Sequence, residues 1–178
     1  FSLSSVNVVS GLALGIDAEA HKGAAFSGGK TTAVLGCGVD VVYPKANRRT
    51  AEIILESGGT IVSEYEPGTM PLKYHFPERN RIISGLSAAT IVIEAPEGSG
   101  ALITADYALE QGRDVFLHSA GLLNRNRCGA GKLADDGAPV FDDPSAVLDF
   151  YGRLEKENTI VVSENFFEDP YYVEDEIE

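Results

Sequence analysis

The sequence predicts an α/β fold with a doubly wound, mainly parallel sheet and helices on both of its faces. Two observations lead to this prediction. Short β-branched runs alternate along the chain with segments of helical spacing, as expected when helices connect parallel strands. The runs are also apolar almost throughout, for example AVLG at 33–36 and TIVIEA at 90–95, which is typical of strands covered on both faces by helices.

Five strands are expected in chain order, each followed by a glycine or polar loop. Their ranges are Val6–Ser10, Thr31–Leu35, Thr60–Glu64, Thr90–Glu94 and Asp114–Leu117. The spacing of apolar residues predicts helices at 15–22, 46–57, 78–87, 101–111 and 144–154. Glycines at 58 and 112 follow two of these helices, as glycines at helix ends commonly do.

The charge of the chain is unevenly distributed. The net charge is −13 over 178 residues, but residues 155–178 hold nine of the 27 acidic residues and a single lysine. The first 154 residues therefore carry 13 basic against 18 acidic side chains and are only mildly acidic. We expect one core domain over 1–154 and a flexible acidic, aromatic tail over 155–178.

Several protein classes are excluded by composition and motifs. No run approaches the roughly 20 apolar residues of a membrane helix. Two distant cysteines without a CxxC indicate neither a zinc site nor a disulfide, and favour a reducing, cytoplasmic setting. The three histidines are isolated from one another, so no metal site is expected. Neither a GxSxG nor a GxxxxGK[ST] motif occurs, and we expect no cofactor and no catalytic residue.

The candidate binding residues follow the predicted strands. Ligands of open parallel sheets bind beyond the carboxyl ends of the strands. Ten of the 14 lysines and arginines fall in or just after the segments that follow the strands, if Lys22 is counted with the first segment. Glycines beside helix starts expose backbone N–H groups to anions, which favours a phosphate ligand. The glycines of GLALGID at 11–17 are equally consistent with a tight packing turn. Further basic candidates are Lys45, Arg48, Arg125 and Arg127.

The most informative stretch lies at 73–81. Lys73 and Phe76 are interleaved with Tyr74 and His75, and the RNR sequence at 79–81 follows. Cations for the backbone and ring faces for unstacked bases are what single-stranded nucleic acid requires. The alternative is that the aromatic residues anchor a loop while the arginines are solvated on a helix.

These motifs together resemble the DNA-processing protein DprA (Smf) family. The strings are SGLALGIDAEAH, AVLGCGVDVVYPKANR, GGTIVSEYEPGTMPLKYHFPERNRIISGLS and EAPEGSGALITADYALEQGRDVF, in the family's order over about residues 8–117. The resemblance implies a bacterial, cytoplasmic protein with a Rossmann-like core that binds single-stranded DNA. It also implies help in loading a RecA-type recombinase during natural transformation and recombination, a homodimer, and no bond-making step.

The resemblance assigns roles residue by residue. The family's Lys-x-x-Phe element falls on Lys73 and Phe76, whose side chains would hold a phosphate and stack a base. The other implied DNA-binding positions are Gly11, Gly15 and Asp17 in the first turn, Arg79, Asn80 and Arg81 in the following helix, and Ser99 with Gly100 in the fourth loop. The chain opens at Phe1, after the point where the family carries a Gly-Ser/Thr-Arg motif, and it resembles a fragment without the family's terminal domains. The family's Pro-Gly-Asn and Gly-Thr-Asn-x-Leu-Ile patterns, which lie in its dimer region, are replaced at 118–124 and 129–134.

Two other functions compete with DNA binding. The PxGxG pattern at 96–100 resembles the LOG-type nucleoside-monophosphate phosphoribohydrolases, whose motif continues to a glutamate that serves the chemistry. Thr104 stands at that position, and a hydroxyl cannot replace a carboxylate in stabilising positive charge on a ribosyl centre. A nucleotide-binding protein is the non-catalytic form of this first alternative. The second alternative is a protein-interaction platform.

Overall fold

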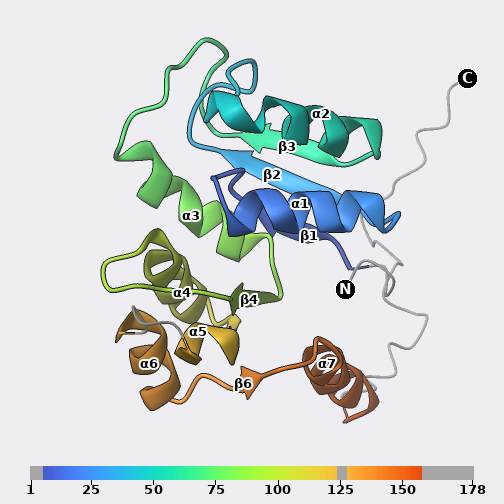
Figure 1. Ribbon diagram of the computed structural model, residues 1–178, viewed down its shortest axis with the longest axis vertical. Coiled ribbons are helices and arrows are strands. Elements are labelled where there is room, and N and C mark those ends of the chain that lie inside the picture. The colour runs from blue at the N-terminus through green and yellow to red at the C-terminus, as the bar shows by residue number, and fades with distance from the viewer. Residues whose placement is uncertain (1–5, 124–127, 158–178) are drawn as a thin grey trace, which may run out of the picture.

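The computed structural model describes residues 6–123 and 128–157 and contains two three-stranded sheets (Figure 1). All neighbouring strands within each sheet are parallel, which confirms the α/β class. The first sheet has the order β1 (Val8–Ser10), β2 (Thr31–Leu35), β3 (Thr60–Ser63), and the second has the order β4 (Ala89–Val92), β5 (Asp114–His118), β6 (Val140–Phe141).

Five helices lie at the positions that the sequence predicts, with shifts of a few residues at their ends. They are α1 (Ile16–Phe26), α2 (Arg48–Glu56), α3 (His75–Gly85), α4 (Gly100–Glu110) and α7 (Ser145–Glu157). The structure adds the 3-10 turn η2 (Lys45–Asn47) and the helices α5 (Ala120–Leu123) and α6 (Cys128–Asp135). Helix α1 ends four residues later than expected, and α3 begins three residues before the expected position and therefore includes His75 and Phe76.

The expectation of a single sheet is corrected within the described residues. No hydrogen-bonded pairing joins β1 to β4, so the strands divide into two sheets. Figure 1 shows the first sheet above the second, with α3 leading from one to the other. Helix α3 packs on β2 and on α4, and this helix contact connects the two halves where strand pairing does not.

The second sheet is covered by helices on both faces, as the contacts of β5 show. Successive side chains of a strand point to opposite faces of the sheet. Val115 and Leu117 of β5 belong to an apolar cluster with residues of α4 and α6. Phe116 points the other way and clusters with Phe141 and with Val147 of α7. The alternation along β5 thus explains why this strand is apolar at every one of these positions.

The sequence did not predict α5, α6 or β6. Helix α6 has the sequence CGAGKLAD, and its two glycines disfavour a helix by about 1 kcal/mol each relative to alanine. Tertiary contacts stabilise it. Ala130 and Leu133 are buried in the apolar cluster that contains Val115 and Leu117 of β5, and the Ala130 amide donates to the Ala95 carbonyl at 3.0 Å. Burial therefore overrides a weak local preference.

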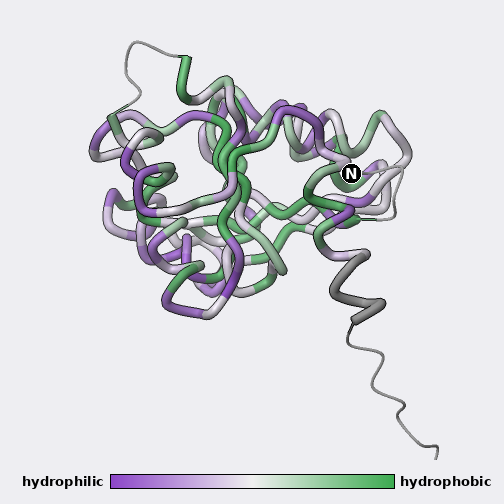
Figure 2. Tube along the Cα trace, turned by 90° about the horizontal axis from the view of Figure 1, so that it is seen from below, coloured by the Kyte–Doolittle hydropathy of each residue, from purple (hydrophilic) through white to green (hydrophobic). Residues whose placement is uncertain are grey.

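Apolar segments concentrate in the middle of the molecule, and hydrophilic segments lie around them (Figure 2). Within residues 6–123 and 128–157, no helix has the length and apolar character needed to cross a bilayer. Helix α7 runs to Glu157, which is past the expected core boundary at residue 154. The remainder of the predicted tail, and the candidates Arg125 and Arg127, lie outside the described residues.

A buried histidine attaches α1 to the first sheet. His21 is fully buried, and its Nδ1 lies 2.6 Å from Thr31 Oγ1, which itself donates to the Val8 carbonyl at 2.7 Å. Since the hydroxyl proton goes to Val8, His21 Nδ1 carries the proton and donates to Thr31. Burial lowers the pKa of His21 to about 4, with Asp17 opposing the shift and Arg79 adding to it.

This histidine predicts a loss of stability in mild acid. Between pH 6.5 and about 4 the imidazole of His21 is protonated in the unfolded chain but not in the folded chain. The free energy of unfolding therefore decreases as the pH is lowered through this range. We expect a loss of about 2 kcal/mol between pH 7 and pH 5 from this group, measured by urea denaturation at each pH. In His21→Asn, which retains a donor near the Nδ1 position, this part of the pH dependence should disappear. His118→Asn keeps the buried histidine and serves as control; equal pH dependence in His21→Asn and the parent would contradict the assignment.

Candidate nucleic-acid interface

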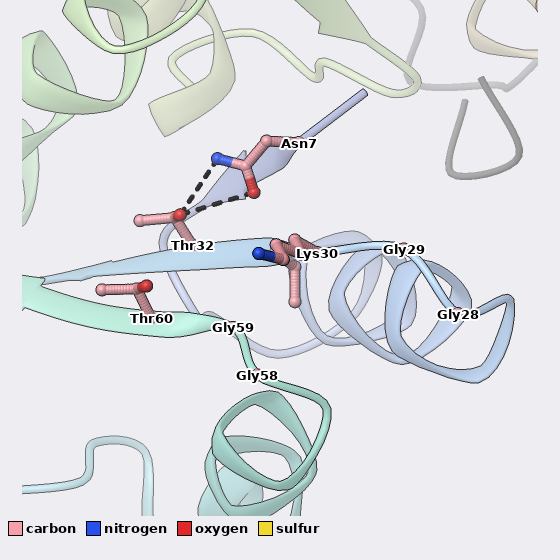
Figure 3. Close-up of a pocket in the computed structure, with 9 residues that line it drawn as sticks. Asn7, Gly28, Gly29, Lys30, Thr32, Gly58, Gly59 and Thr60 are labelled. Atoms are coloured by element: carbon pink, nitrogen blue, oxygen red, sulfur yellow. Dashed lines mark hydrogen bonds between the residues drawn. The ribbon is translucent and has the colours of Figure 1, made fainter. Parts of the chain in front are cut away.

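The carboxyl ends of β1, β2 and β3 meet at one edge of the first sheet, because the three strands are parallel and in register. Three segments leave this edge, at 11–15, 36–47 (which ends in η2) and 64–74, and we call the surface that they form with the start of α3 the strand-end surface. It carries the candidates Gly11, Gly15, Lys45, Lys73 and Phe76. The opposite edge has a shallow pocket lined by Asn7, Gly28–Thr32 and Gly58–Thr60 (Figure 3).

Phe76 is held at the strand-end surface by the residue before it. His75 is buried, and its Nδ1 donates to the Gly36 carbonyl at 3.0 Å, which fixes the first turn of α3 over the end of β2. The partly exposed ring of Phe76 then packs against Gly36, where an added Cβ would lie 3.0 Å from its Cδ1. A Cβ at position 36 would push this ring by a few tenths of an ångström, so glycine permits the close approach that the ring makes here.

Other aromatic rings surround His75 and Phe76. Tyr43, from the loop after β2, lies against Phe76 with the ring centroids 5.5 Å apart and the planes tilted by 33°. Tyr65 stacks on His75 at 4.0 Å, and Tyr74 meets the same imidazole edge-on at 4.7 Å. Sequence reasoning did not identify Tyr43 and Tyr65 as site residues, because only the fold brings them beside α3.

Two lysines of this surface are available to an anionic ligand. Lys73 precedes α3 and Lys45 begins η2, and both side chains are exposed. Neither forms an ion pair with another residue in the described part of the chain. An exposed ammonium group without a carboxylate partner can bind a phosphate without first breaking an internal contact.

The arginines near this edge are engaged in internal contacts. Arg81 pairs with Glu64, and Arg48 lies 3.5 Å from Glu52 on its own helix. Arg79 is 4% exposed, and its Nη1 donates to the Gly11 carbonyl at 2.8 Å and to the Val34 carbonyl. Burial lowers the pKa of Arg79, and the nearby carboxylate of Asp17 opposes the shift. The strand-end surface is therefore less basic than the sequence suggests.

The turn at 11–17 is organised by Asp17. Its Oδ2 accepts hydrogen bonds from the amides of Gly11 and Ala13, both at 3.1 Å. A carboxylate thus already occupies the position that an external anion would take at these amides. Gly11 is buried, and a Cβ there would lie 2.5 Å from Arg79, whereas Gly15 is exposed with φ +83°. Gly11 and Asp17 accordingly shape the turn from within.

The start of α4 is connected to this site through Asn80. The buried Asn80 side chain donates from Nδ2 to the Gly100 carbonyl at 3.2 Å, which links α3 to the first turn of α4. Ser99 is the residue before α4, and its buried Oγ has no hydrogen-bond partner among the described residues. Asn80, like Arg79, therefore acts as an internal support, while Gly100 is exposed at the helix start.

The hydrolase alternative receives no support from this region. Thr104, which stands where the phosphoribohydrolases carry their glutamate, donates from Oγ1 to the Gly100 carbonyl at 3.0 Å. Its hydroxyl is thus bonded to the preceding turn of its own helix.

Comparisons with known proteins agree with one another. The family model described as DNA recombination-mediator protein A matches residues 1–152. DNA processing protein DprA of Streptococcus pneumoniae is 49% identical over 141 residues, and protein Smf of Synechocystis is 55% identical over 151 residues. These matches cover 79% and 85% of this chain but 50% and 38% of the relatives, so the chain spans half or less of their length.

Two solved structures share the fold. The X-ray structure of DprA from S. pneumoniae matches with a TM-score of 0.75 and 47% identity, covering 83% of this chain and 52% of the other. DNA processing protein A from Helicobacter pylori, described for its single-stranded DNA binding mode, matches with a TM-score of 0.71 and 28% identity, covering 88% and 69%. The fold is Rossmann-like, as in these structures. With a family match over almost all of the described residues, the chain belongs to the DNA recombination-mediator protein A family, the DprA/Smf proteins.

Proposed function

We propose that this chain binds single-stranded DNA at the strand-end surface, with Lys73 on the DNA backbone and Phe76 against a base. The observation that carries the proposal is the exposed Lys73, which has no acidic partner among the described residues, three residues before a partly exposed ring that packs on Gly36 beside the anchored His75. Cations beside exposed ring faces bind the backbone and the unstacked bases of a single strand without sequence preference. The family of the chain and the single-stranded DNA binding ascribed to the H. pylori protein support this choice.

Because the arginines are engaged in internal contacts, few cations remain for phosphate, and the affinity for DNA should depend only weakly on salt. Lys73 and Lys45 are the exposed cations of this surface without an acidic partner among the described residues, since Arg79 is buried and Arg81 is paired. Each phosphate contact on a single strand contributes about 0.7 to the slope of log K against log salt. Two lysines therefore predict a shallow slope of about 1.4, with aromatic stacking supplying much of the affinity.

The test is a fluorescence-anisotropy titration of labelled oligo-dT, and of duplex of equal length, at several salt concentrations. Lys73→Ala should weaken binding and lower the salt slope by about 0.7, because one phosphate contact is lost. Lys30→Ala is the matched control, since Lys30 is an exposed lysine at the opposite edge of the sheet (Figure 3). An unchanged slope in Lys73→Ala, or equal loss in Lys30→Ala, would show that the site is misplaced.

The proposed biological role follows from the family. Sequence-tolerant capture of single strands suits a protein that receives DNA in natural transformation and passes it to a RecA-type recombinase. We include that recombinase, and a second copy of this chain in a homodimer, as proposed partners. Retention of purified RecA on the immobilised chain, with and without oligo-dT, tests the first, and sedimentation equilibrium tests the second. RecA retention without DNA, combined with no DNA binding, would favour a protein-interaction platform.

A further inference from the structure

Tyr43 lies against Phe76 and is exposed at the strand-end surface. It is not one of the residues that contact DNA in the proposed function. Its side chain is 46% exposed, whereas Phe76 is only partly exposed beneath its contacts with Gly36 and Tyr43. Within the described residues, no hydrogen bond engages the Tyr43 hydroxyl, and its recorded ring contact is with Phe76. Single exposed apolar side chains are common, so this exposure acquires meaning only from what surrounds it.

The loop that carries Tyr43 is fixed on both sides of the tyrosine. Before it, Asp40 Oδ1 accepts a hydrogen bond from the Gly68 amide at 2.7 Å, which ties this loop to the one after β3. After it, the buried Asn47 donates from Nδ2 to the carbonyls of Leu12 and Ala13, both at 2.9 Å, which ties it to the loop after β1. Tyr43 is thus held by three connected loops, and a group fixed before binding loses little entropy when a ligand arrives.

The charges on either side of the two rings suit a nucleic-acid strand. Lys45 follows Tyr43 by two residues in the same loop, and Lys73 precedes Phe76 by three. Both lysines are exposed and have no acidic partner in the part of the chain that the structure describes. Each ring therefore has an exposed lysine within three residues of it in the sequence, Lys45 at the start of η2 for Tyr43 and Lys73 before α3 for Phe76.

We propose that Tyr43 is a second base-stacking residue, which forms with Phe76 a two-ring platform for unstacked bases of single-stranded DNA, with Lys45 as its adjoining phosphate contact. This inference rests on the proposed function and extends the site beyond the Lys73–Phe76 pair. The planes of the two rings are tilted by 33°, an arrangement between stacked and edge-on. Tyr43 is the more exposed of the two, so an incoming base would meet its ring first.

Affinity measurements test the stacking role. Tyr43→Ala should lower the affinity for oligo-dT about 5-fold or more, as expected for loss of one stacked base, without changing the salt slope. Tyr43→Phe should bind within about 2-fold of the parent, because the ring face and not the hydroxyl makes the contact. Phe26→Ala is the control, since Phe26 is 74% exposed at the end of α1, beside the pocket at the opposite edge. Loss of affinity in Tyr43→Phe would overturn stacking as the cause.

The pairing of the two rings is tested by a double-mutant cycle. If Tyr43 and Phe76 form one platform, Tyr43→Ala combined with Phe76→Ala should cost clearly less than the product of the two single fold-losses. If the loss of affinity in the double variant equals the product of the two single fold-losses, the rings act independently and the shared platform is excluded. Circular dichroism and thermal melting of each variant establish that it is folded at the temperature of the titration.

A fluorescence experiment separates contact from indirect effects. The chain contains no tryptophan, so Tyr43→Trp introduces a single indole at the proposed site. Its emission should be quenched saturably by oligo-dT, at the concentrations at which anisotropy reports binding, while Phe26→Trp should not respond. Binding by anisotropy with no quenching of Tyr43→Trp would overturn this inference and leave the proposed function standing. No binding of oligo-dT by the parent chain would overturn both.

Discussion

Arg79→Met should lower the free energy of unfolding by about 2–5 kcal/mol, the largest effect on stability that we expect from a single substitution in this chain. The substitution keeps much of the apolar stem but removes the guanidinium, which leaves the buried carbonyls of Gly11 and Val34 without their donor. Each unpaired buried polar group costs about 1–3 kcal/mol. Urea denaturation followed by circular dichroism at pH 7 measures the change.

A matched control lies two residues further along α3. Arg81→Met removes the same group, but Arg81 is exposed and pairs with Glu64 at the surface. Surface ion pairs contribute about 0–1 kcal/mol, so this variant should unfold close to the parent. Equal stability of the two variants would mean that the buried guanidinium does not hold the ends of β1 and β2 together. Arg79→Lys should recover only part of the loss, because one ammonium lacks the rigid fork of donors.

Phe76→Ala should produce the largest loss of DNA affinity, about 5- to 150-fold for oligo-dT, corresponding to about 1–3 kcal/mol for one stacked base. The salt slope should stay at the value of the parent, because no phosphate contact is removed. This combination distinguishes Phe76 from Lys73, whose replacement by alanine should change the slope. Anisotropy titration at three or more salt concentrations gives both quantities from one series.

The packing role of Phe76 requires its own control. Its ring also contacts Gly36 and Tyr43, so alanine removes packing as well as a stacking surface. Phe76→Leu keeps an apolar side chain over Gly36 but has no ring, and it should bind as weakly as Phe76→Ala while unfolding closer to the parent. If Phe76→Leu binds oligo-dT like the parent, stacking on this residue is excluded.

The internal contacts give the strand-end surface two kinds of residue. Lys73, Phe76, Lys45 and Tyr43 are exposed or partly exposed and are available to a ligand. The remaining candidates among the described residues are mostly supports: Asp17 fixes its turn, Arg79 joins two strand ends, and Asn80 connects α3 with α4. Substitutions in the second group should reduce stability and binding together. Substitutions of Lys73, Lys45 and Tyr43 should reduce binding with little effect on stability, whereas Phe76→Ala should also lose the packing of its ring on Gly36.

Local patterns were sufficient for much of the fold. All five expected strands and all five expected helices occur, because β-branched runs, apolar spacing and glycine stops act within a few residues. Helices α5 and α6 and the two-residue strand β6 were missed. Helix α6 is stabilised by burial in the apolar cluster around Val115 and Leu117, and not by local preference. The division into two sheets was missed for the same reason, because strand pairing is a long-range property.

The sequence by itself determined the α/β class, the family, and the placement of Lys73 and Phe76 beside strand ends, because each of these depends on residue types at short spacing. Only the tertiary structure decided which cations are available. Arg79 and Arg81 look alike in the RNR sequence, yet two residues along a helix separate them by about 200°, so one points inward and the other outward. Tyr43 reaches Phe76 across 33 positions of sequence because the parallel strands bring their loops to one edge, which no local pattern encodes.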